Sequence, residues 1–176
     1  MVRAILDGRK TQTRRVITPQ PEWGVYQITV CPYGEPGDTL WVREDMYLHG
    51  ANQNHYYSAD KQGVGNVIHE RLMQETASGR SKASTRTIPS IFMPKWACRL
   101  RLTVTDIRVE RLQGISWLDA VAEGVSPSVE SIGNPVSESA ARADIAAFAE
   151  LWDSINIKKH PWESNPWVWV ISWEQS

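Results

Sequence analysis

The C-terminal residues 167–173 restrict the possible folds most, because the run Trp-Val-Trp-Val-Ile-Ser-Trp is apolar at almost every position. Side chains of a β-strand alternate between its two faces, so this run places apolar side chains on both faces. Strands of that kind are covered by other layers on each side. We therefore predict a central strand at this end of the sequence.

A second strand is predicted at residues 99–112, where the apolar pattern changes phase halfway along. Before the change, Leu100, Leu102 and Val104 alternate on one face. After it, Ile107 and Val109 continue on the opposite phase. A slip of one residue near Thr105 and Asp106 would keep them all on the inner side, as a β-bulge does in a curving sheet. Long, bulged strands favour a small barrel over a flat sheet.

Two helices are predicted in the C-terminal half. Ser116 and Asp119 have the spacing of a capping box, so a helix should begin after Ser116, continue through Glu123 and end at Gly124. Residues 137–156 carry apolar side chains at helical spacing, namely Ala141, Ile145, Phe148, Trp152 and Ile155. Together with the strands, these helices predict an α+β fold, a small mixed barrel of about five or six strands with two or three helices packed outside.

The remaining segments are shorter or less regular. We predict short strands at 26–30 and 39–44 and a short extended piece at 90–93 between two prolines. Residues 52–87 are rich in Gln, Asn, Gly, Ser and Thr and show little sustained periodicity. An irregular stretch of this length is usually a functional loop, a lid or disorder, and we predict high mobility there. The predicted organisation is one domain over residues 1–176 with a long insertion at about 52–87.

The 176 residues carry a net charge of −1, but the charges are unevenly distributed. Residues 1–15 hold five basic residues against one acid, and residues 76–105 hold six basic residues and no acid. Residues 112–153 hold seven acids and a single arginine. A basic face formed by the first two regions would receive phosphate, although solvated surface charge is the commoner explanation.

Cysteine content and hydropathy indicate a protein of a reducing compartment. Cys31 and Cys98 are too few for a disulfide framework, and neither has another Cys or a His at metal-ligand spacing. The longest apolar runs are far shorter than a membrane span, and no signal-peptide core follows Met1. We predict a soluble cytoplasmic protein with no membrane association and with no metal or other cofactor.

Residues 8–15 combine an amine, hydroxyls and guanidinium groups in the run Gly-Arg-Lys-Thr-Gln-Thr-Arg-Arg. Residues 2–7 have apolar side chains at helical spacing, and Gly8 stands where a left-handed C-cap residue is expected. Lys10 and Thr13 would face opposite sides of a regular strand, and they can meet only if the segment bends or makes a helical turn. A basic, solvated loop is the alternative interpretation of this segment.

The order of several short motifs resembles that of the ASCH domain family, which belongs to the PUA-like superfamily of small β-barrels. The family signature Gly-x-Lys-x-x-(Glu or Thr)-x-Arg falls on Gly8, Lys10, Thr13 and Arg15. The matching segments that follow are Pro-Gly-Asp at 36–38, Leu-Trp-Val-Arg at 40–43, Ala-Glu-Gly at 122–124, Leu-Trp-Asp-Ser-Ile-Asn at 151–156 and Asn-Pro-Trp-Val-Trp-Val at 165–170. The last two make the chain most similar to the longer members found in phage and prophage genomes. Compact members lack the insertion, and most members have a strand before the opening helix, so we expect a missing strand or a start inside a longer product.

The resemblance implies recognition of RNA or nucleosides. In one branch of the family, the N4-acetylcytidine amidohydrolases, a Lys, a Thr and a Glu act at the positions of Lys10, Thr13 and Glu123. By this analogy Thr13 would attack the acyl carbon and Lys10 would accept its proton, while Glu123 would protonate the departing amine and activate water. Lys10 could act in this way only with a pKa lowered by burial and by neighbouring arginines.

Two other functions remain open from the sequence. A non-catalytic module would bind RNA or single-stranded nucleic acid through phosphate contacts from Arg15, Arg43, Lys95, Arg99 and Arg101. A metal-independent ribonuclease would use Lys10 to stabilise a pentavalent phosphate, although the four histidines are interpreted as surface residues and form no evident pair. For the hydrolase we predict that its three residues line one concave cleft, with Arg15 or Arg43 at the margin and an aromatic ring on the wall.

Overall fold

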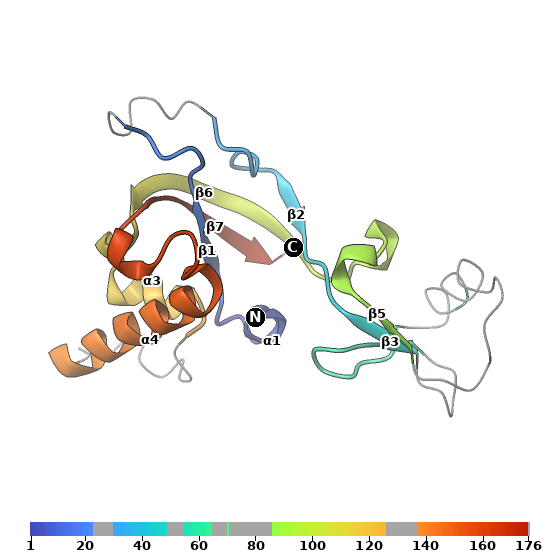
Figure 1. Ribbon diagram of the computed structural model, residues 1–176. Coiled ribbons are helices and arrows are strands. Elements are labelled where there is room, and N and C mark those ends of the chain that lie inside the picture. The colour runs from blue at the N-terminus through green and yellow to red at the C-terminus, as the bar shows by residue number, and fades with distance from the viewer. Residues whose placement is uncertain (23–29, 49–54, 65–69, 71–85, 126–136, 176) are drawn as a thin grey trace. The chain divides into compact units, whose positions relative to one another are not determined.

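The computed structural model describes residues 1–22, 30–48, 55–64, 70, 86–125 and 137–175 (Figure 1). The chain divides into two units. Unit 1 consists of Met1, residues 3–39 and residues 102–176, and unit 2 consists of Val2 and residues 40–101. No helix within the described ranges has both the length and the apolar character that a membrane crossing requires.

Unit 1 is organised around a curled antiparallel sheet that forms half of a barrel. Its central strand is β7 (Trp167–Gln175), which pairs with β1 (Gln12–Val16) on one side and with β6 (Arg101–Arg111) on the other. β2 (Thr39–Trp41) follows β6 in the sheet order, and unit 2 begins within it. The prediction of a central C-terminal strand is confirmed, since both faces of β7 are buried through Val168, Trp169, Val170, Ile171 and Trp173.

The curl of this sheet follows from the bulge predicted in β6. The pairing of β6 with β7 shifts register between Val104, which lies opposite Trp173, and Asp106, which lies opposite Ser172. A bulge leaves one residue unpaired and bends its strand, and the sheet bends with it. The change of apolar phase in the sequence therefore marks the position at which the sheet curls.

Two helices cover one face of this sheet (Figure 1). α3 (Trp117–Ala122) begins with the predicted capping box, in which the Ser116 hydroxyl accepts from the Asp119 N–H and the Asp119 carboxylate accepts from the Ser116 N–H. α4 (Glu138–Asn156) covers the predicted range. The core between helices and sheet consists of Leu112, Ile115, Ala120, Phe148, Trp152, Val168 and Val170. Ile155 was expected on the inner side of α4, but it is 63% exposed and lines a cavity beside β1.

A short helix, α1 (Val2–Leu6), precedes β1, and Gly8 follows it with a φ of +69°, as predicted for a left-handed C-cap. Beyond this corner the Lys10 N–H donates to the Ala4 carbonyl at 2.9 Å. Lys10 also forms an isolated antiparallel bridge with Glu123. The turn at Gly8 therefore brings the chain before β1 against the end of α3. Single 3₁₀ turns, η4 (Leu112–Gly114) and η6 (Trp162–Ser164), precede α3 and β7.

Unit 2 contains a second antiparallel sheet with the strand order β4-β3-β5. Its elements are β3 (Met46–Leu48), β4 (His55–Tyr57), β5 (Arg86–Ile88) and the 3₁₀ turns η2 (Ser90–Phe92) and η3 (Lys95–Ala97). Its core consists of Met46, Tyr57, Val64, Ile88, Met93 and Ala97. The Tyr57 hydroxyl donates to the Ala97 carbonyl at 2.8 Å, which ties β4 to η3.

Three predictions for the irregular segments are wrong. Residues 52–87 include β4 and β5, and Tyr57 and Val64 of this segment belong to the core of unit 2, because strands of three residues are too short to show periodicity in a sequence. The piece predicted as extended at 90–93 forms the turn η2, in which the Phe92 N–H donates to the Pro89 carbonyl at 2.9 Å. His55 was interpreted as a surface residue, but it is 2% exposed because it lies with Tyr57 on the buried face of β4.

The barrel and the two other short strands differ from expectation in extent. The described strands of unit 1 form half of a barrel, and β1 and β2 are its edges, so a closed PUA-like barrel is not confirmed. The strand predicted at 39–44 ends at Trp41. The strand predicted at 26–30, and much of the mobility predicted for 52–87, concern residues outside those that the structure describes.

Candidate active site

A buried ion pair joins the start of β1 to the end of α3. The Lys10 ammonium donates to Oε2 of Glu123 at 2.7 Å and to the Glu123 backbone carbonyl at 2.8 Å. The two side chains are only 3% and 5% exposed. Two of the three predicted catalytic residues, 113 positions apart in the sequence, are therefore in direct contact.

Close packing at Gly124 makes this contact possible. Gly124 has a φ of +82°, a backbone conformation that residues with a Cβ rarely adopt. A Cβ at this position would lie 3.0 Å from Cβ of Lys10 and 3.1 Å from Cβ of Ala4. Any other residue would push the chain near Lys10 away from the end of α3, so the glycine after Glu123 helps to position the ion pair.

Arg14 holds the second oxygen of the Glu123 carboxylate. Its Nη1 lies 3.2 Å from Oε1 of Glu123, and its Nη2 lies 2.5 Å from Oε1 of Glu110 and 3.5 Å from Oδ2 of Asp119. The Arg14 side chain is completely buried. Arg14 is not among the site residues predicted from the sequence. The signal that could have found it is the period-two spacing, which places Arg14 and Lys10 on one face.

Asp119 connects this network to the capping box of α3. Its carboxylate accepts hydrogen bonds from Nε2 of Gln12 at 3.0 Å and from Nη2 of Arg108 at 2.8 Å. Burial alone would raise the pKa of Asp119, but hydrogen bonds from Ser116 and Gln12 hold it below its usual range, with help from two nearby arginines. These bonds fix the start of α3 against β1 and thereby fix the helix that carries the catalytic candidate at its end.

Burial lowers the pKa of the Lys10 ammonium, because the charged form loses more than the neutral amine when it leaves water. The Glu123 carboxylate raises that pKa through its charge and its hydrogen bond, and Arg15 and Arg14 lower it by repulsion. The net change in pKa is downward. Lys10 is therefore neutral in a larger fraction of molecules than a solvated lysine, as a general base must be.

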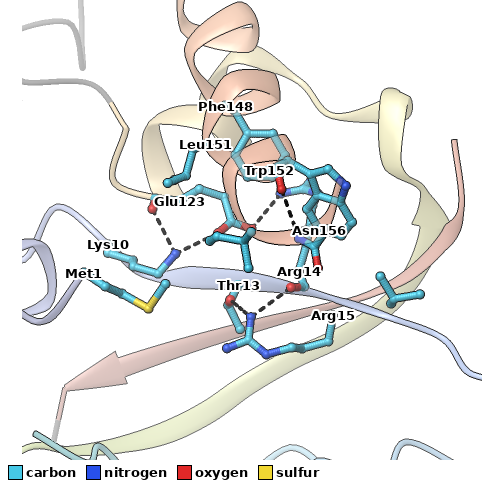
Figure 2. A pocket seen from close by; sticks show the side chains of 12 residues that line it. Met1, Lys10, Thr13, Arg14, Arg15, Glu123, Phe148, Leu151, Trp152 and Asn156 are labelled. Atoms are coloured by element: carbon cyan, nitrogen blue, oxygen red, sulfur yellow. Dashed lines mark hydrogen bonds and ion pairs between the residues drawn. The ribbon is translucent and has the colours of Figure 1, made fainter. Parts of the chain in front are cut away.

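Thr13 lies on the opposite side of β1 from the ion pair (Figure 2). Its Oγ1 accepts a hydrogen bond from Nη1 of Arg15 at 2.6 Å, and the same nitrogen donates to the Arg14 carbonyl at 2.9 Å. In the register of β1 with β7, Thr13 pairs with Ile171 and Arg15 pairs with Trp169. Thr13 and Arg15 thus share the sheet face that α4 does not cover. Within the described residues, no hydrogen bond joins Thr13 to either member of the ion pair.

A cavity of about 230 Å³ lies beside β1 (Figure 2). The residues that line it come mainly from β1 and α4, namely Met1, Lys10, Thr13, Arg14, Arg15, Val16, Glu123, Phe148, Leu151, Trp152, Ile155 and Asn156. The cavity can reach both faces of β1 because β1 is an edge strand of the sheet. All three predicted catalytic residues therefore line one cavity with Arg15 and two aromatic side chains, although the Thr13 hydroxyl is bonded away from the ion pair.

The other predicted binding residues belong to unit 2. Arg43 is exposed and lies over the ring of Trp41, with 4.7 Å between its Cζ and the ring centroid. Lys95 and Arg101 are also exposed. Arg99 is held by two carboxylates of unit 2, and its side chain is only 16% exposed. Of the predicted phosphate contacts, Arg15 is the residue that lines the cavity in unit 1.

Among the described residues, no three His, Cys, Asp or Glu side chains lie close enough together to hold a metal ion. Comparison with known proteins found no matching family model, no matching curated protein and no matching solved structure. The resemblance to ASCH domains thus rests on the sequence motifs and stays a prediction.

Proposed function

We propose that the chain binds an acylated nucleoside, free or within single-stranded RNA, and hydrolyses its amide bond through Lys10 and Glu123. The observation that carries this proposal is the buried pair itself, since it lies in the wall of a cavity that also has aromatic side chains. The motifs shared with the ASCH family support the substrate class. As part of the same proposal, the half-barrel of unit 1 corresponds to the PUA-like barrel of that family.

Arg14 provides independent support for a ligand in this cavity. Its side chain lines the cavity and is completely buried, yet its Nε–H has no hydrogen-bond partner among the described residues. Buried donors almost always have a partner, so an unpaired one marks a position at which a ligand acceptor would bond. The carbonyl oxygen of a cytosine base is an acceptor of this kind.

The chemistry follows from the lowered pKa of Lys10. In its neutral form the amine takes a proton from a water molecule whose oxygen bonds to the acyl carbon. When the carbon–nitrogen bond breaks, the departing nitrogen takes that proton from Lys10, and the products are a carboxylic acid and the free amine of the nucleoside. Glu123 stabilises the lysine cation that forms between the two steps, because its Oε2 lies 2.7 Å from Nζ.

Thr13 is the alternative nucleophile. To reach the acyl carbon beside Lys10, its hydroxyl would have to leave Arg15, which holds it at 2.6 Å on the other side of β1. Direct attack by water needs no such movement, so the geometry favours it. A Thr13→Ala variant separates the two routes, since turnover survives under direct attack and is lost if Thr13 is the nucleophile.

The proposal is tested with N4-acetylcytidine and a chromatographic assay for released cytidine. Lys10→Met should lower turnover by about 10²- to 10⁴-fold, the usual contribution of a general base. Lys158→Met is the matched control, because Lys158 is exposed on the same unit and should leave turnover unchanged. Equal turnover in the parent and in Lys10→Met would overturn the proposal.

A non-catalytic binding module is the second candidate, and the exposed Arg15 favours it. Arg15 donates from Nη1 to Thr13 and to the Arg14 carbonyl, and in the described part of the chain it has no carboxylate partner. Its remaining N–H groups suit a phosphate oxygen. A parent protein that binds single-stranded RNA and leaves N4-acetylcytidine intact would support this function, and the RNA length after incubation would reveal ribonuclease action.

A further inference from the structure

A second cavity adjoins the first at the ion pair. Its volume is about 340 Å³, and Lys10, Glu123, Met1 and Leu151 line both cavities. The side chains that line only the second are apolar, namely Ala4, Val125 and Ala147, with Gly124 between them. Among the described residues that line this cavity, only Lys10 and Glu123 have polar side chains.

The two cavities share Lys10 and Glu123 in their walls but differ in the chemistry of their other lining residues. The first presents Arg14, Arg15 and Asn156 together with aromatic rings, which suits the polar, planar base of a nucleoside. The second presents aliphatic surface, which suits a hydrocarbon chain. An amide whose carbonyl carbon lies next to Nζ of Lys10 would have its nitrogen substituent on one side and its acyl chain on the other.

We infer that the second cavity binds the acyl group of the substrate and that the protein prefers aliphatic acyl groups longer than acetyl. The inference rests on the proposed function, because it takes the ion pair as the position of the amide. The methyl group of an acetyl substituent would leave most of a 340 Å³ cavity empty. Each further methylene that leaves water should strengthen binding about fourfold until the cavity is full.

The experiment compares N4-acetyl-, N4-butanoyl- and N4-hexanoylcytidine in turnover and in binding. Binding is measured by calorimetry with Lys10→Met, because the expected loss of turnover of about 10²- to 10⁴-fold leaves most of the substrate intact during the measurement. We expect affinity to rise with chain length, and kcat/KM of the parent to rise in the same order. Ala147→Phe should fill the second cavity and bring the hexanoyl-to-acetyl affinity ratio close to one. Ala146→Phe is the control, because Ala146 is an exposed neighbour on α4 that lines neither cavity, and it should keep the parent ratio.

The outcomes separate this inference from the proposed function. Affinity that rises with chain length without any turnover would support the acyl cavity and overturn the hydrolase. Turnover of the acetyl substrate with affinities that do not depend on chain length would support the hydrolase and overturn the inference. A change of the ratio that is equal in Ala147→Phe and Ala146→Phe would also overturn it, because the effect would not come from filling the cavity.

Discussion

Each unit contains an ion pair with a buried carboxylate, and the two pairs have the same closest N–O distance but different surroundings. Lys10 and Glu123 of unit 1 are 2.7 Å apart, and so are Arg99 and Glu44 of unit 2. The carboxylate side chain is nearly inaccessible in both, at 5% and 1% exposure. Burial of an ion pair therefore does not by itself distinguish a reactive site from a structural one.

The Arg99 cluster has the character of a structural clamp. Glu44 accepts from both Nε and Nη2 of Arg99, Asp60 and Gln62 accept from Nη1, and the guanidinium lies over the ring of Tyr57 at 4.0 Å. Burial would lower the pKa of Arg99, but its hydrogen bonds with the two carboxylates raise it above the usual range. A guanidinium that stays charged cannot act as a base, and one whose N–H groups are already hydrogen-bonded has few donors left for a substrate.

Lys10 differs in the two properties that chemistry requires. Burial lowers its pKa, which shifts the balance toward the neutral amine, and it borders two cavities that could hold the parts of a substrate. The comparison suggests a general criterion for buried pairs. A titratable amine that borders a cavity indicates a reactive site. A guanidinium whose N–H groups are hydrogen-bonded to carboxylates indicates a structural ion pair.

The largest effect on stability is expected from Arg99→Met. This variant leaves the Glu44 carboxylate buried without its cation, which should cost about 3–5 kcal/mol in the free energy of unfolding. Urea unfolding measures the loss, and Arg101→Met is the control, since Arg101 is exposed and should change the free energy by less than about 0.5 kcal/mol. Folded Arg99→Met should hydrolyse N4-acetylcytidine like the parent. If Arg99→Met lost turnover with little loss of stability, the Arg99 cluster would be the reactive one and its structural role would be wrong.

The parts of the fold that the sequence predicted depend on local chemistry. The capping box of Ser116 and Asp119, the corner at Gly8 and the phase change in β6 each involve a few neighbouring residues. Each of these features has a fixed geometric consequence, which is why the position of Glu123 at the end of α3 could be anticipated.

The parts that the sequence did not predict depend on distant partners. Arg14 meets Glu123 across 109 positions, and neither the charge of Arg14 nor its neighbours reveals that it is buried. The strands of unit 2 are three residues long, and their apolar residues find each other only in the folded core. The orientation of Thr13 likewise follows from the pairing of β1 with β7.

Two of the segments that carry the ASCH resemblance stabilise the turn between α4 and β7. The Asp153 carboxylate in 151–156 accepts from the Trp162 N–H at 2.7 Å. The Asn165 side chain at the start of 165–170 accepts from the Gln113 N–H at 2.8 Å, and its φ is +42°. In this chain the two segments therefore have a structural role, and the variants of Lys10 test the proposed reaction.

A smaller effect is expected from Gly124→Ala, which tests whether the Lys10 pair depends on close packing. The left-handed backbone should cost alanine about 1–2 kcal/mol, and the new methyl would also press on Cβ of Lys10 at 3.0 Å. Gly8→Ala is the matched control, because Gly8 also follows a short helix with positive φ but has no atom within 4 Å of an added Cβ. Both variants should lose stability in urea, and only Gly124→Ala should lose turnover. Equal turnover in the two would mean that the packing of Gly124 does not position Lys10.

The smallest expected effect is a pH dependence of the free energy of unfolding that comes from the proton on Lys10. The Lys10 pair should show this dependence, and the Arg99 cluster should not. The unfolded chain holds this proton up to about pH 10.4, whereas the folded protein releases it at a lower pH. Between these two values the unfolded state binds more protons, so the free energy of unfolding should rise with pH in the parent relative to Lys10→Met. Below the folded pKa both states are protonated, and this difference should be constant. Arg99 stays charged throughout and should contribute no such slope.

Because the same Lys10 proton controls both stability and catalysis, turnover of N4-acetylcytidine should rise over the same pH range as the stability difference. Turnover that rises while the stability difference stays flat would mean that the catalytic base is a group other than Lys10.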